Sequence, residues 1–471
     1  MQVMNILVFG LGMNGGGFAA AEYFLDHGET VRVTDLKGGD DLQQEVDTLT
    51  RKGAVCITGV HRDEDFQWAD VVIKNPAIPP DNPLLKDAKA IKNDMWYLFT
   101  SPFSQNVKFI AVTGTKGKTT TCFAIAHALK AMGHTAQLCG NMGISAFTVL
   151  TDWEAGNVPE YLVIEMSSWQ IRDTYTALGE SMPPFEAAVL TAFYPDHQNS
   201  YHSMEEYLDD KLKLFQAKDR VILVPETLKA AVSSTRNIPL SRIHTLDGAS
   251  SDFEESLRPA ATTLSLLFFK NKDIEKAFAT FGGVPHRSEC VACKGSVTFI
   301  NDSAATIAEA VHFSLSRYRD ATIHLITGGT DKNLSPEAMT EDLKRAESVT
   351  LLSGSFTTKK LLPLLDSLSI PYGGPFTTMR EAVKSAYEAA KKEETLHPLQ
   401  PQVVILSPGC ASFELFINEF DRGDQFRAEA VSLASPDTVD VRQANSMHRR
   451  NGQPSSHTSD VGPSVPRRKK S

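Results

Sequence analysis

The stretch that decides the fold is Ile110-Ala-Val-Thr-Gly114-Thr-Lys-Gly117-Lys118-Thr119-Thr120-Thr121. A buried-strand pattern over residues 107–112 meets a glycine-rich turn, and a helical pattern over residues 122–132 follows it. Glycines let successive backbone N–H groups point into one concavity, and the helix N-terminus adds partial positive charge. The order of strand, turn and helix therefore predicts a phosphate-binding loop in an α/β domain.

The side chains of this loop indicate a nucleoside triphosphate with Mg²⁺. Lys118 supplies a positive charge for the β- and γ-phosphates, and the Thr119 hydroxyl suits a Mg²⁺ ligand. Two residues separate the glycines, fewer than in the standard phosphate loop. A plain chain reversal is the alternative, and Gly-Lys-Thr-Thr after a buried strand disfavours it. We expect the nucleotide to contact the whole loop, namely Gly114, Thr115, Lys116, Gly117, Lys118, Thr119 and Thr120.

A second glycine-rich turn lies near the N-terminus. A strand pattern over residues 4–9 leads into Gly10-Leu-Gly12-Met-Asn-Gly15, and a second strand ends at Asp35, twenty residues after Gly15. This is the dinucleotide fingerprint, in which a pyrophosphate approaches a helix N-terminus. By itself it favours a nicotinamide-dependent oxidoreductase, but UDP-linked ligands carry a pyrophosphate too.

Strand and helix patterns alternate along most of the chain, which predicts an α/β protein with largely parallel sheets. We expect three domains: a Rossmann-like domain over 1–105, a P-loop-type ATP-binding domain over 106–283, and a Rossmann-like domain over 284–433. Residues 434–471 are rich in Ser, Arg, Asn and Pro, so we expect a disordered tail. The remaining expected strands cover 30–34, 70–74, 161–164, 187–190, 220–224, 297–300, 322–327, 349–352 and 403–406.

Composition excludes several classes of protein. The chain has 471 residues and a net charge of −10, which argues against a nucleic-acid surface. Its six scattered cysteines suit a reducing compartment, and we expect the Cys290/Cys293 pair to be small core or surface residues. No apolar run could span a bilayer, and the sequence opens on a strand pattern instead of a signal peptide. We expect a cytoplasmic monomer.

Side chains that could bind a metal ion or take part in catalysis follow several strands of the central domain. Glu165 ends one strand, Asp196-His197 follow another, and a carboxylate at such a place suits Mg²⁺. Lys211 lies in a helical pattern over 207–215, where the pattern alone favours a solvated lysine.

The last domain shows the same arrangement. Arg287 follows a hinge-like Gly-Gly-Val-Pro, so its planar fork could reach phosphates of a neighbouring domain. Asp302 ends a strand, where it could accept hydrogen bonds from ribose hydroxyls. Two further strand-end loops contain Lys332 and Ser412. Side chains of this kind at strand ends in several domains suggest a cleft between the domains.

With these motifs the chain resembles the Mur ligase family, the ATP-dependent amide-forming enzymes of peptidoglycan synthesis, over about residues 5–432. Its glycine loop at Gly10, residues 328–332, the serine loop 406–413 and Arg422-Gly423 look most like the branch that adds D-glutamate. The shared family motifs are Thr113-Gly-Thr-Lys-Gly-Lys-Thr-Thr120, Gly140-Asn141-Met-Gly143, Glu165-Met-Ser-Ser-Trp-Gln170, Asp196-His197, Lys211, His286-Arg287 and Asn301-Asp-Ser303.

The resemblance implies ATP and Mg²⁺ as cofactors, and UDP-N-acetylmuramoyl-L-alanine and D-glutamate as substrates joined through an acyl phosphate. Lys118, Glu165, His197 and Lys211 would carry the catalysis, and Arg287 and Asp302 would contact the nucleotide. Mg²⁺ would bind Thr119, Glu165, His197 and Lys211, the last matching a lysine that the family carbamylates. The UDP-linked substrate would meet Gly12, Met13, Asn14, Asp35, Lys37, Asn75, Asn141 and Gln170, and D-glutamate would meet Thr306, Lys332 and Ser412.

The chain departs from the family pattern at three places. Ala304 stands where members often carry lysine, an adenine-binding Gly-x-His-Asn-x-x-Asn segment is not recognisable between 250 and 272, and residues 418–421 read Asn-Glu-Phe-Asp. The rivals are an L-alanine-adding ligase, a folylpolyglutamate-synthase-like ligase and a degenerate nucleotide-binding partner. The N-terminal glycine loop favours a UDP-linked substrate over folate, and the catalytic set argues against degeneration.

Overall fold

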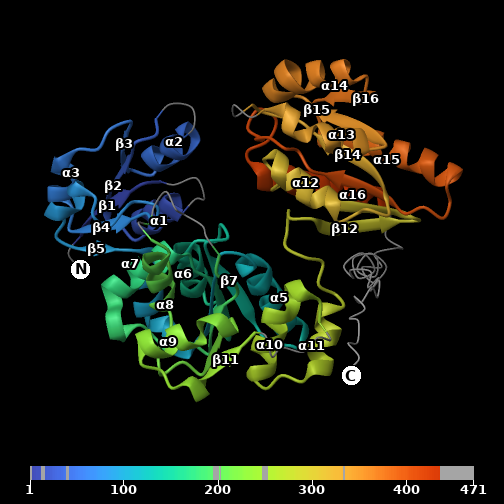
Figure 1. The fold of residues 1–471 in the computed structure, drawn as a ribbon. Helices are drawn as coiled ribbons and strands as arrows, with labels where there is room; N and C mark the ends of the chain where they lie inside the picture. Colours follow the sequence, from blue (N-terminus) through green and yellow to red (C-terminus); the bar gives the residue numbers. More distant parts are fainter. Residues whose placement is uncertain are drawn as a thin grey trace, which may run out of the picture. The chain divides into compact units, whose positions relative to one another are not determined.

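The computed structural model describes residues 3–11, 16–38, 42–194, 201, 203–246, 253–331 and 335–434. Five expected site residues, Gly12, Met13, Asn14, His197 and Lys332, lie outside these ranges, as does the expected tail from residue 435 onward. The chain divides into two compact units, Met1–Phe281 and a second that begins at Gly282 (Figure 1). The first unit holds two parallel sheets and the second one largely parallel sheet, all covered by helices.

The first sheet has five parallel strands in the order β3-β2-β1-β4-β5. Its central strand β1 is buried on both faces because helices cover both, with Ile6 and Val8 in one core and Leu7 and Phe9 in another. The chain order reverses between β1 and β4, which is where open α/β sheets bind ligands. The elements are β1 (Asn5–Phe9), α1 (Gly16–Asp26), β2 (Thr30–Asp35), α2 (Gln43–Arg51), β3 (Val55–Thr58), α3 (Asp63–Trp68), β4 (Val71–Lys74), β5 (Ile91–Lys92) and α4 (Asp94–Thr100).

The second sheet has six parallel strands in the order β11-β10-β9-β6-β8-β7. Met95 of α4 and Phe147 of α6 belong to one continuous core with the first sheet, so both sheets form a single unit. The elements are β6 (Lys108–Thr113), α5 (Lys118–Ala131), β7 (Ala136–Gly140), α6 (Ala146–Glu154), β8 (Tyr161–Glu165), α7 (Ser168–Leu178), β9 (Ala187–Leu190), α8 (Met204–Leu212), β10 (Val221–Val224), α9 (Lys229–Arg236), β11 (Ile243–Thr245), α10 (Arg258–Leu266) and α11 (Asn271–Phe278).

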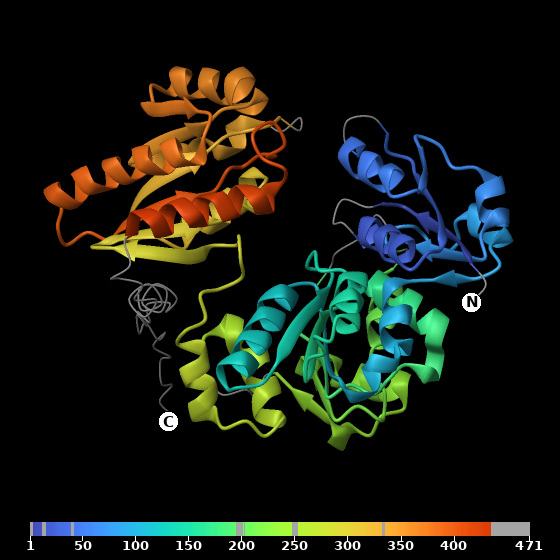
Figure 2. The same cartoon turned by 180° about the vertical axis from the view of Figure 1, so that it is seen from behind.

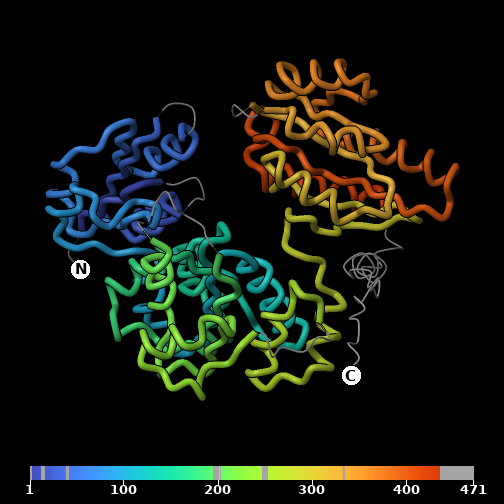
Figure 3. Tube along the Cα trace, in the orientation of Figure 1, coloured from blue at the N-terminus to red at the C-terminus, as the bar shows by residue number. Residues whose placement is uncertain are grey.

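The second unit holds a six-stranded sheet in the order β12-β13-β17-β14-β15-β16, in which β12 runs antiparallel to β13. Helices α15 and α16 lie side by side on one face of the sheet (Figure 2), and α12, α13 and α14 cover the other face. Figure 3 shows the path of the same chain as a Cα trace. The elements are β12 (Glu289–Lys294), β13 (Val297–Asn301), α12 (Ala308–Ser316), β14 (Thr322–Thr327), α13 (Thr340–Arg345), β15 (Ser348–Leu352), α14 (Leu362–Leu368), β16 (Tyr372–Phe376), α15 (Met379–Leu396), β17 (Gln402–Leu406) and α16 (Glu419–Ala434).

The structure confirms the predicted α/β class with largely parallel sheets, while the exact domain boundaries stay predictions. Sequence patterns missed β3, β5, β7, β11, β12 and β16, which are short, lie at a sheet edge, or both. Cys290 and Cys293 lie half-buried on β12, as expected, and neither forms a disulfide with a described cysteine. Among the described helices, none combines the length and apolar character needed to cross a membrane.

Substitution of Gly17 tests how closely α1 packs on the first sheet. A Cβ there would lie 2.3 Å from the Gly10 carbonyl oxygen and 2.6 Å from the Leu11 Cα, whereas a Cβ on Gly16 would meet nothing within 4 Å. We expect Gly17→Ala to destabilise the first unit by about 1–3 kcal/mol, because backbone must move to admit the methyl group. Gly16→Ala is the matched control and should melt within a degree or so of wild type. Equal thermal melting of the two variants by circular dichroism would contradict this packing.

Candidate functional site

The phosphate loop joins β6 to α5. Gly114 has a φ of +147° and Gly117 a φ of +82°, a region that favours glycine. A Cβ on Gly114 would also lie 2.2 Å from the Thr191 hydroxyl oxygen. Helix α5 begins at Lys118, directly after Gly117, so the free N–H groups of its first turn lie at the loop. The glycines of the predicted loop thus stand where this backbone requires them.

A buried carboxylate lies beside this loop. Glu165 ends β8, which pairs with β6, and its side chain is buried. Its Oε2 accepts a hydrogen bond from Thr119 Oγ1 at 2.7 Å. Lys118 folds over the loop, where its Nζ donates to the Gly114 carbonyl oxygen at 2.9 Å. The structure therefore brings together three residues that sequence analysis placed in one site.

The position of Lys211 contradicts the solvated lysine that its helical pattern favoured. The side chain is 1% exposed, so it is not a solvated lysine. Its Nζ donates to the Gly114 carbonyl oxygen at 3.4 Å and lies 4.5 Å from the ring centre of Tyr207. The physical reason is that α8 turns the face bearing Tyr207 and Lys211 into the unit. Two lysines, Lys118 and Lys211, thus converge on one carbonyl of the phosphate loop.

The oxygen atoms of Thr119 and Glu165 are hard donors of the type that Mg²⁺ takes in proteins. Within the described ranges, no group of three or more His, Cys, Asp or Glu side chains could enclose a metal ion. Mg²⁺ at nucleotide sites takes most of its ligands from phosphates and water, and the oxygens of Thr119 and Glu165 fit such a cation.

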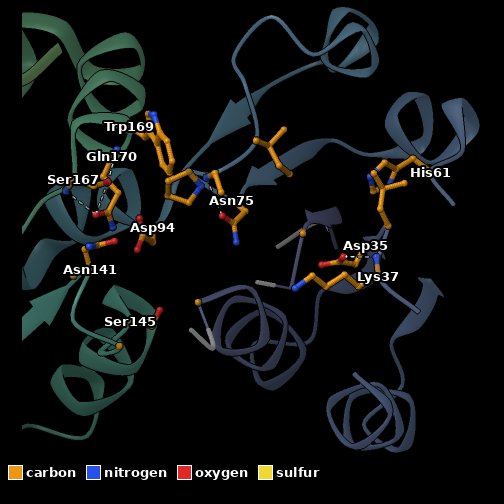
Figure 4. A pocket seen from close by; sticks show the side chains of 18 residues that line it. Asp35, Lys37, His61, Asn75, Asp94, Asn141, Ser145, Ser167, Trp169 and Gln170 are labelled. Atoms are coloured by element: carbon orange, nitrogen blue, oxygen red, sulfur yellow. Dashed lines mark hydrogen bonds between the residues drawn. The ribbon is translucent and has the colours of Figure 1, made fainter. Parts of the chain in front are cut away.

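A cavity of about 520 Å³ lies beside the carboxyl ends of β1 and β4, at the reversal point of the first sheet. Figure 4 shows side chains from the first sheet on one side, and residues from the turn after β7 and from the start of α7 on the other. Five of the residues expected to bind the UDP-linked substrate line the cavity, namely Asp35, Lys37, Asn75, Asn141 and Gln170. The structure thus assembles in one place residues that are distant in the sequence.

Two of these residues also shape the cavity wall. Asp35 accepts hydrogen bonds from the backbone N–H of Leu11 through Oδ2 at 2.9 Å, and from that of Lys37 through Oδ1 at 2.8 Å. Gln170 forms a capping box with Ser167 at the start of α7. Their side chains therefore fix the backbone that lines the cavity.

Asn141 connects the cavity with the phosphate loop. It lines the cavity, and its Nδ2 donates to Glu165 Oε1 at 3.2 Å. Glu165 holds Thr119 of the loop through its other oxygen. A ligand in the cavity would therefore end close to the phosphates of a nucleotide on the loop.

Sequence analysis did not find several lining residues, among them His61, Asp94 and Trp169. His61 packs edge-on against Phe9, and its Nδ1 lies 2.8 Å from Thr34 Oγ1. Burial raises the pKa of Asp94 to about 6. Of these three residues, Trp169 alone had a local signal, since it lies inside the Glu165–Gln170 motif.

In the second unit, the loops after β13 and β17 meet. Gly409 N–H donates to the Ala305 carbonyl oxygen at 2.8 Å, which brings together the segments bearing Thr306 and Ser412. Asp302 accepts from Ser288 N–H through Oδ1 and from Ser407 Oγ through Oδ2, both at 2.9 Å, and burial raises its pKa.

The predicted nucleotide contacts of the second unit differ in exposure. Both Asp302 oxygens already accept hydrogen bonds within the unit, and the Arg287 side chain is exposed. The roles of Arg287, Asp302, Thr306 and Ser412 in ligand binding stay predictions.

Comparisons with known proteins match both parts of the first unit. A family model described as the Mur ligase middle domain matches residues 112–273, and one for the N-terminal domain of MurD-like Mur ligases matches residues 4–95. A UDP-N-acetylmuramoylalanine–D-glutamate ligase of Borreliella afzelii is 33% identical over 460 residues, which covers 90% of this chain and 97% of that protein. Proteins of the same name from Roseiflexus sp. and Bacteroides fragilis are 32% and 31% identical, and cover 89% and 90% of this chain and 97% and 98% of their own.

Lys118 is the direct test of the phosphate loop. We expect Lys118→Ala to abolish turnover, because it removes the charge that would stabilise the β- and γ-phosphates. Lys130→Ala, at an exposed position in the last turn of the same helix, is the control and should turn over normally. Turnover is measured as phosphate release from ATP. Near-normal activity of Lys118→Ala would mean that the loop does not bind nucleotide phosphates.

Proposed function

The chain belongs to the Mur ligase family, and on that premise we propose that it joins D-glutamate to UDP-N-acetylmuramoyl-L-alanine at the expense of ATP. Curated relatives that are named for this reaction match about nine-tenths of the chain. The observation that carries the proposal is the hydrogen bond from Asn141 to Glu165, because it sets the substrate cavity against the phosphate loop.

The reaction begins with transfer of the γ-phosphoryl group of ATP to the L-alanine carboxylate. Lys118 would stabilise the charge on the moving phosphoryl group from its place at the helix N-terminus. When bound, Mg²⁺ would neutralise phosphate charge, and its protein ligands would be Thr119, Glu165, His197 and the carbamate of Lys211. Asp35, Lys37 and Asn141 would bind and orient the UDP-linked substrate in the cavity.

In the second step the amine of D-glutamate attacks the acyl phosphate, and the tetrahedral intermediate expels phosphate. Thr306, Lys332 and Ser412 of the second unit would hold the amino acid. Arg287 and Asp302 would contact the nucleotide. Exclusion of water from the closed site would protect the acyl phosphate from hydrolysis. The reaction needs neither a nucleic acid nor a membrane, and we place it in the cytoplasm, carried out by a monomer.

The proposed reaction is tested by phosphate release from the purified chain with ATP, Mg²⁺ and a panel of acceptors. Release should require both UDP-N-acetylmuramoyl-L-alanine and D-glutamate, and the product should gain the mass of one glutamyl residue. UDP-N-acetylmuramate with L-alanine is the control, since it is the substrate pair of the L-alanine-adding rival. Release with that pair alone would overturn the assignment to the D-glutamate-adding reaction.

Lys211 would act as a carbamate. The neutral amine attacks CO₂ and loses a proton, which turns a cation into a carboxylate-like metal ligand. Lys211 is placed for this role because it is almost wholly buried beside the phosphate loop. The Mg²⁺ gathered by Glu165 and the phosphates would hold the carbamate in place.

We expect Lys211→Ala to lower the ligation rate by several orders of magnitude while the chain stays folded. A short carboxylic acid in the medium should restore part of the activity of this variant, and bicarbonate should do so for wild type depleted of CO₂. Lys211→Arg should be as inactive as Lys211→Ala, because arginine keeps a positive charge, which is the wrong sign for a metal ligand. Normal rates for the alanine or arginine variant would show that Lys211 only fills space.

A further inference from the structure

Lys74 is a buried cation that the proposed mechanism leaves without a role. It ends β4 after three apolar residues, and it is 4% exposed. Its Nζ lies 2.6 Å from Asp173 Oδ2, an ion pair between the first sheet and helix α7 that packs on the second. Burial lowers the pKa of Lys74 and raises that of Asp173, while their attraction opposes both shifts. A pair of buried charges is costly unless each is held by further polar contacts.

The further contacts of Lys74 go to the wall of the substrate cavity. Its Nζ also donates to the carbonyl oxygens of Asn75 at 3.2 Å and of Ile78 at 2.7 Å. Asn75, Pro76, Ala77 and Ile78 all line the cavity, and Figure 4 shows Asn75 between Asn141 on the left and Asp35 on the right. One ammonium group therefore fixes both ends of this cavity turn.

Asp173 ties the same cation to the opposite wall. It lies on α7, and the cavity is lined by the N-cap of this helix, Ser167, and by Trp169 and Gln170 in its first turn. A second buried contact, from Asn93 Nδ2 to Thr174 Oγ1 at 2.8 Å, holds the same helix. The ion pair thus sets the spacing between two cavity walls that come from different sheets.

The charges continue toward the phosphate loop. Arg172 Nε lies 3.4 Å from Asp173 Oδ1, and Arg172 Nη1 lies 3.7 Å from Asp210 Oδ2. Asp210 is buried and precedes Lys211, and it also accepts a hydrogen bond from Tyr201. The chain of charged groups therefore begins at the cavity turn and ends beside the lysine that contacts the loop.

We propose that Lys74 and Asp173 are a positioning pair for the UDP-linked substrate: they hold turn 75–78 at a fixed distance from the start of α7. Neither residue touches the reacting atoms. The inference rests on the proposed function, since it names the substrate of that site, and it adds two residues that no sequence motif marks.

The experiment compares Lys74→Met, the double variant Lys74→Met/Asp173→Met and wild type as full-length chains. Lys74→Met should raise KM for UDP-N-acetylmuramoyl-L-alanine about tenfold or more, and KM for ATP should stay within about twofold of wild type. The double variant removes the unpaired carboxylate, so its melting temperature should recover. Its KM for the UDP-linked substrate should stay raised, because the carbonyls of Asn75 and Ile78 still lack their donor.

Lys89→Met is the matched control, since it breaks an ion pair with Asp70 on the exposed surface of the same sheet unit. It should leave both KM values unchanged. A double variant with normal KM for the UDP-linked substrate would overturn the proposal, as would equal increases in both KM values.

Calorimetric titration of UDP into the same chains separates this proposal from the proposed function. If wild type binds UDP but ligates nothing, the proposed function fails, and weaker UDP binding by both Lys74 variants still supports the pair. Unchanged UDP affinity in both variants would overturn it.

Discussion

Glu165 accepts hydrogen bonds from Thr119 on one side and from Asn141 on the other, while its side chain is 2% exposed. A buried carboxylate needs such partners because it has lost its water. The backbone permits the arrangement only because Gly140 has no side chain: a Cβ there would lie 2.1 Å from the Glu165 carbonyl oxygen. Through this one group the phosphate loop, the end of β8 and the wall of the cavity are held in register.

A chain of buried charges lies between the cavity and the phosphate loop. Lys74, Asp173, Asp210 and Lys211 are all nearly inaccessible, and they form a path from one to the other. Removing several charges from water stabilises a fold only when geometry and hydrogen bonds compensate, so such a cluster is poor evidence for stability. Its place between two binding regions fits a positioning role better than a structural one.

In the second unit, too, a buried charged side chain joins separate loops through hydrogen bonds. Arg422 is fully buried, and its guanidinium donates to Ser303 Oγ and to the carbonyl oxygens of Ser303 and Ala411 at 2.9 to 3.2 Å. A planar fork can satisfy several carbonyls at once, which a lysine cannot do with fixed geometry. The loops after β13 and β17 are thereby joined in the region where we propose that D-glutamate binds.

The sequence alone determined the phosphate loop, the parallel α/β class and the family, because each rests on motifs of residues close together in the chain. The missed strands lie at the edges of the three sheets, where most residues are only partly buried. Only the tertiary structure decided that Lys211 is buried and that Lys74 meets Asp173. The Lys211 contact joins residues 97 positions apart. A helical pattern gives the spacing of side chains, but which of its faces is buried depends on what packs against it, and that is decided by distant parts of the chain.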